Sequence, residues 1–250
     1  MKTTFLALVM TAMIALMSCN EDGSTLSGLQ VSMKATTTTS KINKSGRVQA
    51  GGFAFEQALI GVREFEFETK EEDDSEDDRK GSSSDDDGED DSEEVEFKGS
   101  YVVDLIKGTS DPELSNGALA PGIYEEFEVE LGRTLANGNS LFIVFKYKPD
   151  TGDSVKVEIS SKATFEFEYE DDNGFEIKDE TLTNYLVLIN LDQLLNGLDL
   201  TKATKSEDGV VRINDTTNSS LLSVIKNNFD NSCEGGKDDD NDDDIDDDND

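Results

Sequence analysis

Apolar and polar residues alternate along most of the chain from Phe53 to Ile213. A period of two is typical of strands that bury one face and expose the other. Such stretches begin at Phe53, Val95, Tyr101, Ile123, Leu141, Val155, Phe165, Phe175, Tyr185 and Val210. About ten short strands joined by turns, with little helix, predict a mainly β protein, an antiparallel β-sandwich rather than an α/β enzyme fold.

Two irregularities interrupt this alternation. The phase slips by one residue at Arg63–Glu64, which predicts a β-bulge or strand break. Asn173-Gly174 lies between Phe165–Tyr169 and Phe175–Ile177. Since Asn-Gly is a strong two-residue turn signal, it predicts a hairpin there.

Pro121-Gly122 precedes another alternating stretch. Proline fixes φ and glycine accepts a positive φ, so this pair predicts a type II turn that leads into a strand. We expect Tyr124 to anchor that strand by packing and by a hydroxyl hydrogen bond.

Helix is predicted only near the C-terminus. Leu191–Asn196 predicts a short turn of helix ended by Gly197. Asp215 or Thr216 can cap a final helix. One apolar stripe of that helix contains Leu221, Leu222, Ile225 and Phe229.

The first 22 residues have the pattern of a targeting segment. Lys2 precedes an apolar run from Phe5 to Met17, which is too short to span a membrane. Leu16-Met17-Ser18-Cys19 resembles the lipobox of bacterial lipoprotein signal peptides, although an ordinary secretory signal that contains a cysteine is the alternative. The resemblance implies cleavage after Ser18 and acylation of Cys19, including fatty acids such as palmitate. Asn20-Glu21-Asp22 directly follow and resemble the export tags of some Gram-negative lipoproteins, which predicts an outer-membrane location facing the cell surface or the periplasm.

Composition divides the rest of the chain into regions. Residues 1–18 are the predicted signal peptide, 19–49 a Ser/Thr-rich tether, and 50–232 the β-sandwich domain. Residues 70–94 are predicted to be an acidic disordered insertion in that domain, and residues 233–250 an acidic disordered tail.

The charge is strongly acidic and unevenly distributed. The net charge is −35, and 25 of the 57 acidic residues lie in Glu71–Glu94 and Asp238–Asp250. Nucleic acid is excluded as a partner because its binding needs clustered Lys and Arg. Cations, basic proteins and glycans are the expected partners, besides the membrane that the N-terminal lipid enters.

Histidine is absent, which excludes Ser-His-Asp, Cys-His and His-containing zinc sites. We expect no catalytic residue and no tightly bound cofactor. Rows such as Glu64/Glu66/Glu68 and Glu166/Glu168/Glu170 predict solvated strand faces.

The tail offers the best candidate ligands for a metal. Oxygen ligands alternate at Asp238, Asp240, Asp242, Asp244 and Asp246, as in a calcium loop. The sixth position lacks the usual Gly and the twelfth lacks Glu, so weak Ca²⁺ binding is expected. Cys233, the cysteine that is not used for lipid, lies beside Gly235-Gly236 and could pair between molecules.

Three segments in order carry a family resemblance: Ala58–Phe67, Phe97–Leu105 and Leu119–Tyr124. They resemble the bacterial lipoprotein family of the domain of unknown function 4382, with Ala120 and Pro121 in reversed order. The resemblance implies a transthyretin-like β-sandwich that is secreted and lipid-anchored, and it brings no activity.

These observations favour a lipid-anchored, non-enzymatic binding or structural module. A calcium-binding surface protein is the first alternative. A secreted hydrolase that uses two carboxylates is the second.

Overall fold

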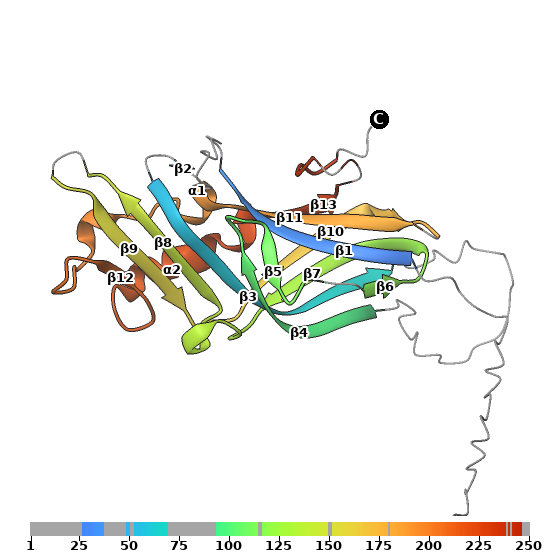
Figure 1. The fold of residues 1–250 in the computed structure, drawn as a ribbon, viewed down its shortest axis with the longest axis horizontal. Coiled ribbons are helices and arrows are strands. Elements are labelled where there is room, and N and C mark those ends of the chain that lie inside the picture. The colour runs from blue at the N-terminus through green and yellow to red at the C-terminus, as the bar shows by residue number, and fades with distance from the viewer. Residues whose placement is uncertain are drawn as a thin grey trace, which may run out of the picture.

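The computed structural model describes residues 27–37, 49–50, 53–69, 94–114, 117–149, 152–179, 181–238, 240 and 242–246. They form two packed sheets, of four and nine strands, with a few short helices (Figure 1). The predicted mainly β sandwich is confirmed. Most strand pairs are antiparallel, but β1 with β11 and β9 with β12 are parallel.

The smaller sheet, sheet A, has the order β13-β11-β1-β6. Its strands are β13 (Cys233–Lys237), β11 (Leu182–Asn190), β1 (Ser27–Thr36) and β6 (Gly117–Leu119).

Two strands of sheet A lie where the sequence predicted a tether and a disordered tail. β1 buries Leu29, Val31 and Met33, a short apolar stripe within a Ser/Thr-rich segment. β13 contains Gly235 and Gly236, so its place depends on backbone pairing with β11. The predicted limits of the β-sandwich domain, residues 50 and 232, are therefore wrong. Both β1 and β13 belong to the domain because each pairs with β11, which is distant from β1 and β13 in the sequence.

The larger sheet, sheet B, has the order β10-β7-β3-β8-β9-β12, and β2, β4 and β5 pair beside this path. Its strands are β2 (Gln49–Ala50), β3 (Phe53–Thr69), β4 (Glu94–Asp104), β5 (Thr109–Asp111), β7 (Gly122–Leu131), β8 (Leu141–Tyr147), β9 (Val155–Ser161), β10 (Phe165–Ile177) and β12 (Val211–Ile213).

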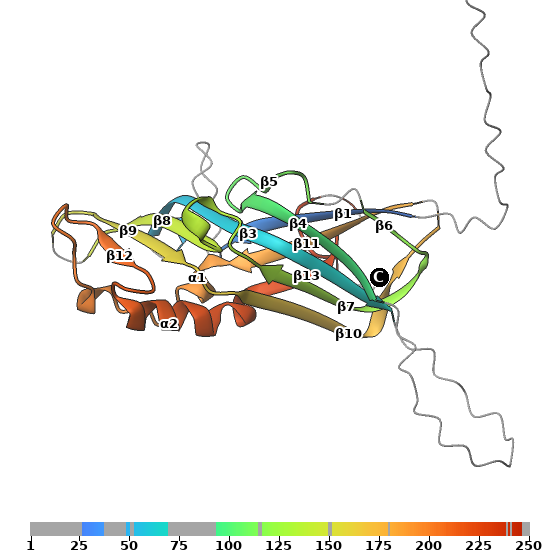
Figure 2. The same cartoon turned by 90° about the horizontal axis from the view of Figure 1, so that it is seen from below.

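Sheet B divides into two halves along β3. One edge of β3 pairs with β8 as far as Ile60 and with β7 from Val62 onward. At the junction, Gly61 N donates to Ser140 O at 2.8 Å, and Gly132 N donates to Gly61 O at 2.8 Å. A Cβ at Gly61 would collide with Thr134 and with the backbone of Gly132. We call β4, the end of β3, β7 and β10 the β7 half, and the start of β3, β8, β9 and β12 the β8 half (Figure 2).

The hairpin around the acidic insertion is as predicted. β3 and β4 pair antiparallel from Leu59↔Asp104 to Glu68↔Glu94, and the register shifts between Val62 and Glu64, at the predicted bulge. Residues 70–93, most of the insertion, lie outside the described residues.

The predicted hairpin at Asn173-Gly174 is wrong. Phe165–Glu170 and Phe175–Ile177 both pair with β7, so β10 keeps its direction and only its register shifts. Gly174 has φ 71°. The positive φ accommodates extra residues in a bulge instead of reversing the chain.

The helices are short. α1 (Leu191–Leu194) is capped by the Asn190 side chain, and Gly197 follows with φ 75°, as predicted. α2 (Ser219–Asn228) buries the predicted apolar stripe, but its N-cap is Asn218 rather than Asp215 or Thr216. The 3₁₀ turns are η1 (Ala136–Gly138), η2 (Leu200–Lys202) and η3 (Asp230–Ser232). Among the described residues, no helix is both long and apolar enough to cross a membrane.

Aromatic rings fill the space between the sheets in the β7 half. The rings of Phe127 and Tyr185 are 4.4 Å apart, and those of Phe67 and Phe127 are 4.7 Å apart. These residues are fully buried. Their neighbours along β3 and β7 therefore point outward.

Candidate functional site

The outer face of the β7 half carries a grid of glutamates on four adjacent strands. Strand register places them in three rows that run from β4 through β3 and β7 to β10. The rows are Glu94-Glu68-Glu126-Glu170, Glu96-Glu66-Glu128-Glu168 and Lys98-Glu64-Glu130-Glu166. We call these eleven glutamates the glutamate face.

The register sets like charges directly opposite one another. Neighbouring strands are about 4.8 Å apart, and like-charged pairs directly across strands are destabilising. Two cations relieve this repulsion at one end of the grid: Lys98 Nζ lies 3.0 Å from Glu64 and also pairs with Glu96, and Arg63 pairs with Glu130. The other rows concentrate the negative charge.

This crowding raises the pKa of several carboxyls. Partial burial, followed by the charges of Glu94 and Glu128, raises the pKa of Glu66 to about 7. Partial burial, followed by Glu168 and Glu68, raises the pKa of Glu126 to about 7. The pKa of Glu128 is raised by burial and by Glu166, and that of Glu168 chiefly by a hydrogen bond with Glu170.

Beside the bulge of β10, the glutamate face contains a hollow. It has a volume of about 250 Å³ and is lined by Glu125, Glu126, Glu170 and Asp171. The carboxylates meet here on the outside of the sandwich, and the apolar core lies on the opposite side of the same strands.

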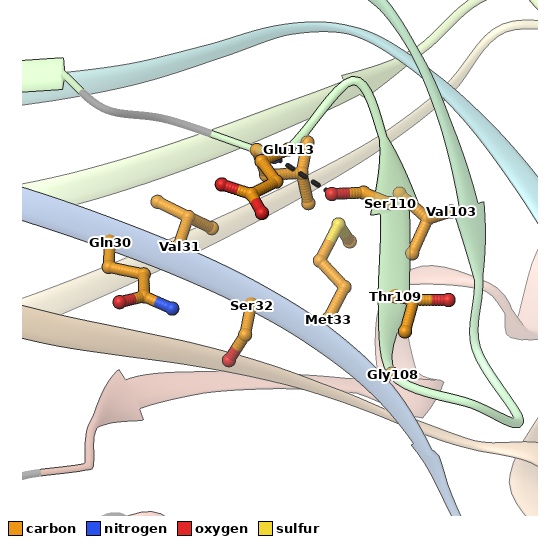
Figure 3. A pocket seen from close by; sticks show the side chains of 10 residues that line it. Gln30, Val31, Ser32, Met33, Val103, Gly108, Thr109, Ser110 and Glu113 are labelled. Atoms are coloured by element: carbon orange, nitrogen blue, oxygen red, sulfur yellow. Dashed lines mark hydrogen bonds between the residues drawn. The ribbon is translucent and has the colours of Figure 1, made fainter.

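A separate cavity of about 340 Å³ opens where β1 and β5 diverge (Figure 3). Val31 and Met33 of β1 face Ser110 and Glu113 across it. Ser110 Oγ accepts a hydrogen bond from Leu114 N at 2.8 Å and so fixes the loop that forms one wall. Glu113 is exposed, and no cluster of charged groups converges on this cavity within the described chain.

The C-terminal loop brings together three of the five predicted calcium ligands. Carboxylate oxygens of Asp238, Asp240 and Asp246 all lie within 4.8 Å of one another, and Asp238 is only 6% exposed. Asp242 and Asp244 lie outside this group and accept hydrogen bonds from Asp244 N and Ile245 N, at 3.1 and 3.0 Å.

The same loop folds back on sheet A. Asp246 N donates to Lys237 O at 2.9 Å, and Ile245 covers Gly236 of β13 so closely that a Cβ there would collide with it. At the sixth position from Asp238, Asp243 has φ 71° and pairs with Lys34 of β1. An aspartate therefore adopts the left-handed conformation for which calcium loops ordinarily use glycine.

The predicted type II turn at Pro121-Gly122 is wrong: the chain only bends at Pro121 before β7 begins. Gly122 lacks the positive φ that this turn requires. It begins β7 and pairs with Ile177, so extended backbone replaces the turn conformation. Tyr124 is as predicted: it is 1% exposed, and its hydroxyl donates to Ala120 O at 3.0 Å.

Cys233 is buried in β13 rather than being available between molecules. Its Sγ lies 3.3 Å from Phe229 O, and burial raises the pKa of the thiol to about 12. Gly235 and Gly236 are strand residues, so the segment expected to present Cys233 packs it against the core. Cys19 lies outside the described residues.

Sequence patterns identified the glutamate rows but not their alignment into a grid. Alternation showed which residues face outward, whereas the grid depends on register between strands that are distant in sequence. Comparisons add no further assignment: no family model, curated protein or solved structure matches the chain. The resemblance to lipoproteins of the domain of unknown function 4382 stays a prediction.

Proposed function

We propose that this chain is a lipid-anchored, non-enzymatic binding module that docks a basic protein on its glutamate face. The observation that carries the proposal is the set of directly opposed glutamates on four strands. Opposed like charges destabilise the folded protein. Features that lower stability are concentrated at functional sites, so the glutamates are expected to have a role in binding.

A basic partner would relieve this repulsion by charge complementarity. Lys98 and Arg63 already do so at one end of the grid, and these ion pairs support the proposal that a partner's cations pair with the remaining rows. Complementary charge increases the rate of association and selects the partner, and salt weakens it. Because the face lies on strands of a packed sheet, binding needs no folding of the module.

Titration of the purified protein with oligolysine tests this proposal. The triple variant Glu66→Gln/Glu126→Gln/Glu128→Gln should bind at least tenfold more weakly at low salt and about pH 8.5, where the raised pKa of these carboxyls still leaves them ionised. Asp153→Asn/Glu207→Gln/Glu234→Gln removes the same charge from exposed positions elsewhere and should change affinity less than twofold. Equal losses in the two triple variants would show that only net charge attracts oligolysine, and would contradict a docking face.

Calcium binding by the C-terminal loop is a second candidate function. The convergence of Asp238, Asp240 and Asp246, with Asp243 in the left-handed conformation, favours it over a diffuse acidic tail. A missing terminal Glu keeps the expected Kd on the order of 10⁻⁴ to 10⁻³ M. Calorimetry should show a Ca²⁺ signal that Asp238→Asn/Asp240→Asn removes and Glu66→Gln/Glu126→Gln retains; the reverse pattern would assign the signal to the glutamate face.

The membrane location belongs to the same proposal and depends on Cys19. Cys19→Ala should abolish incorporation of a fatty-acid label and release the protein from membranes. A labelled, membrane-bound variant would contradict the anchor.

A carboxylate hydrolase is the weaker alternative, because the described carboxylate clusters lie on exposed faces and not in a closed cleft.

A further inference from the structure

The β8 half carries a second cavity on the outer face of sheet B, of about 440 Å³. This volume lies in the range typical of small-molecule sites, about 300 to 1,000 Å³. Its floor comes from β8, β9 and β12, and its rim from η1 and the segment after β12. We call it the β8 cleft.

Strand register builds the floor of the β8 cleft from two rows of side chains. Phe142 of β8 lies directly opposite Ser160 of β9. Glu158 of β9 lies beside Arg212 of β12, and Asn214 continues β12 on the same face. The half-buried ring of Phe142 thus lies between Ser160 of β9 on one side and Leu59 of β3 on the other.

The charged groups of the β8 cleft balance one another. Arg212 and Lys162 are opposed by Glu158 and Asp215 among the lining residues, so the cleft is formally neutral in a chain whose net charge is −35. Neutrality disfavours small ions as ligands, because an ion leaving water needs uncompensated charge of opposite sign.

Ion pairs and a backbone hydrogen bond hold two of these charged groups in place. Arg212 donates to both carboxylate oxygens of Asp208, at 2.9 and 2.7 Å, and its Nε lies 3.2 Å from Glu158. Asp215 accepts from Lys162 N and Lys226 Nζ, each at 3.2 Å. Such fixed polar groups bind a ligand with less loss of side-chain entropy.

Other polar groups of the β8 cleft remain available for a ligand. Within the described part of the chain, the side chains of Asn137, Asn139 and Ser160 and the Lys162 ammonium form no hydrogen bond or ion pair. Amides and hydroxyls both donate and accept, which suits hydroxyl groups that do the same. Asn137, at the rim, has φ 65°.

We propose that the β8 cleft binds a neutral carbohydrate, with Phe142 stacked on the sugar ring and the side chains of Asn137, Asn139, Ser160 and Lys162 hydrogen-bonded to its hydroxyls. An aromatic face favours the weakly positive C–H face of a sugar, and the surrounding amides and hydroxyls complete the contacts at its edges. This site is independent of the glutamate face, which lies on other strands.

Phe142→Trp provides a direct test, because the chain contains no tryptophan. The substitution keeps an aromatic platform and places the single tryptophan of the chain in the cleft, where its emission can be excited apart from that of the tyrosines. We expect its emission to shift and saturate when the purified protein is titrated with neutral tetrasaccharides of glucose, xylose, mannose or N-acetylglucosamine. The corresponding uronic acid or sulfated oligosaccharides should bind at least fivefold more weakly.

Calorimetry on variants that lack the introduced tryptophan provides the control. For whichever neutral sugar binds, Phe142→Ala and Asn139→Ala should each weaken affinity at least fivefold. Tyr147→Ala, which truncates a half-buried ring on the same strand outside the cleft, should change affinity less than twofold. Circular dichroism confirms that each variant is folded. Absence of saturable binding to all four neutral sugars, or binding that Phe142→Ala leaves unchanged, would overturn the proposal.

Discussion

At the scale of single residues, the glutamate face determines how stability depends on pH. The pKa of Glu66 and of Glu126 in the folded protein is about 7, above the ordinary value of 4.5. A raised pKa means that the fold favours the protonated form. The stabilising contribution is therefore complete below about pH 4.5 and is lost as pH rises through 7.

Glu66→Gln and Glu126→Gln should therefore stabilise the protein at pH 8 and have little effect at pH 5. We expect each to raise the free energy of unfolding at pH 8 by about 0.5 to 1 kcal/mol, because solvent screens these partly exposed groups. Urea denaturation at the two pH values measures the change. Glu207→Gln, on an exposed loop, is the control and should have no effect at either pH; destabilisation at pH 8 by the face variants would contradict the repulsion.

Tyr124 shows the opposite case, a polar atom satisfied inside the core. Tyr124→Phe removes the hydrogen bond to Ala120 O and leaves that carbonyl without this donor. The expected loss of stability is about 1 kcal/mol, measured by urea denaturation. Tyr147→Phe, at a half-buried ring, should cost less than half as much. An equal cost for the two variants would mean that the Tyr124 hydroxyl has no special role.

At the scale of elements, local pattern predicted most of sheet B. The strands that alternate strongly, the bulge at Arg63–Glu64 and the hairpin of β3 with β4 were all anticipated. Sheet A was predicted poorly: β13 has little apolar content and depends on pairing with β11, and the alternating Leu29, Val31 and Met33 of β1 lie within a segment otherwise rich in Ser and Thr. The sequence predicts a hairpin at Asn173-Gly174 where the structure has a bulge, because Asn-Gly suits both and only the pairing of β10 with β7 distinguishes them.

β1 is the element whose existence most needs a test, because its sequence resembles a tether. Val31 is 4% exposed, whereas its neighbour Ser32 points the other way and is half-buried. Val31→Asp buries an unpaired charge and should lower the free energy of unfolding by about 3 kcal/mol or more, whereas Ser32→Asp should cost less than about 1 kcal/mol. If thermal unfolding showed that both variants lower the free energy of unfolding by similarly small amounts, the segment would be a tether and not a strand of sheet A.

The acidic insertion should be dispensable for the fold. Glu94 pairs with Glu68 in the hairpin, so a deletion should end at residue 93. Replacing residues 71–93 by Asn-Gly should change the free energy of unfolding by about 1 kcal/mol or less, because closure entropy varies only logarithmically with loop length. Loss of cooperative unfolding would show that the insertion contributes to the core.

At the scale of the whole molecule, the junction at Gly61 separates two kinds of surface on one sheet. The β7 half presents opposed glutamates, and the β8 half presents a neutral, polar cleft with an aromatic floor. Both lie on the outer face of sheet B, while the inner face is covered by sheet A in the β7 half and by α2 in the β8 half (Figures 1 and 2). A module of this design could hold a basic protein and a glycan at the same time.

The most direct measurement of the docking surface is a map of backbone amide shifts in the ¹⁵N-labelled protein during titration with oligolysine. The account predicts that the largest shifts fall on the glutamate-bearing parts of β3, β4, β7 and β10, disappear at high salt, and leave β9 and β12 unchanged. Shifts spread over all acidic segments, or confined to the C-terminal loop, would contradict the assignment of the glutamate face as the binding surface.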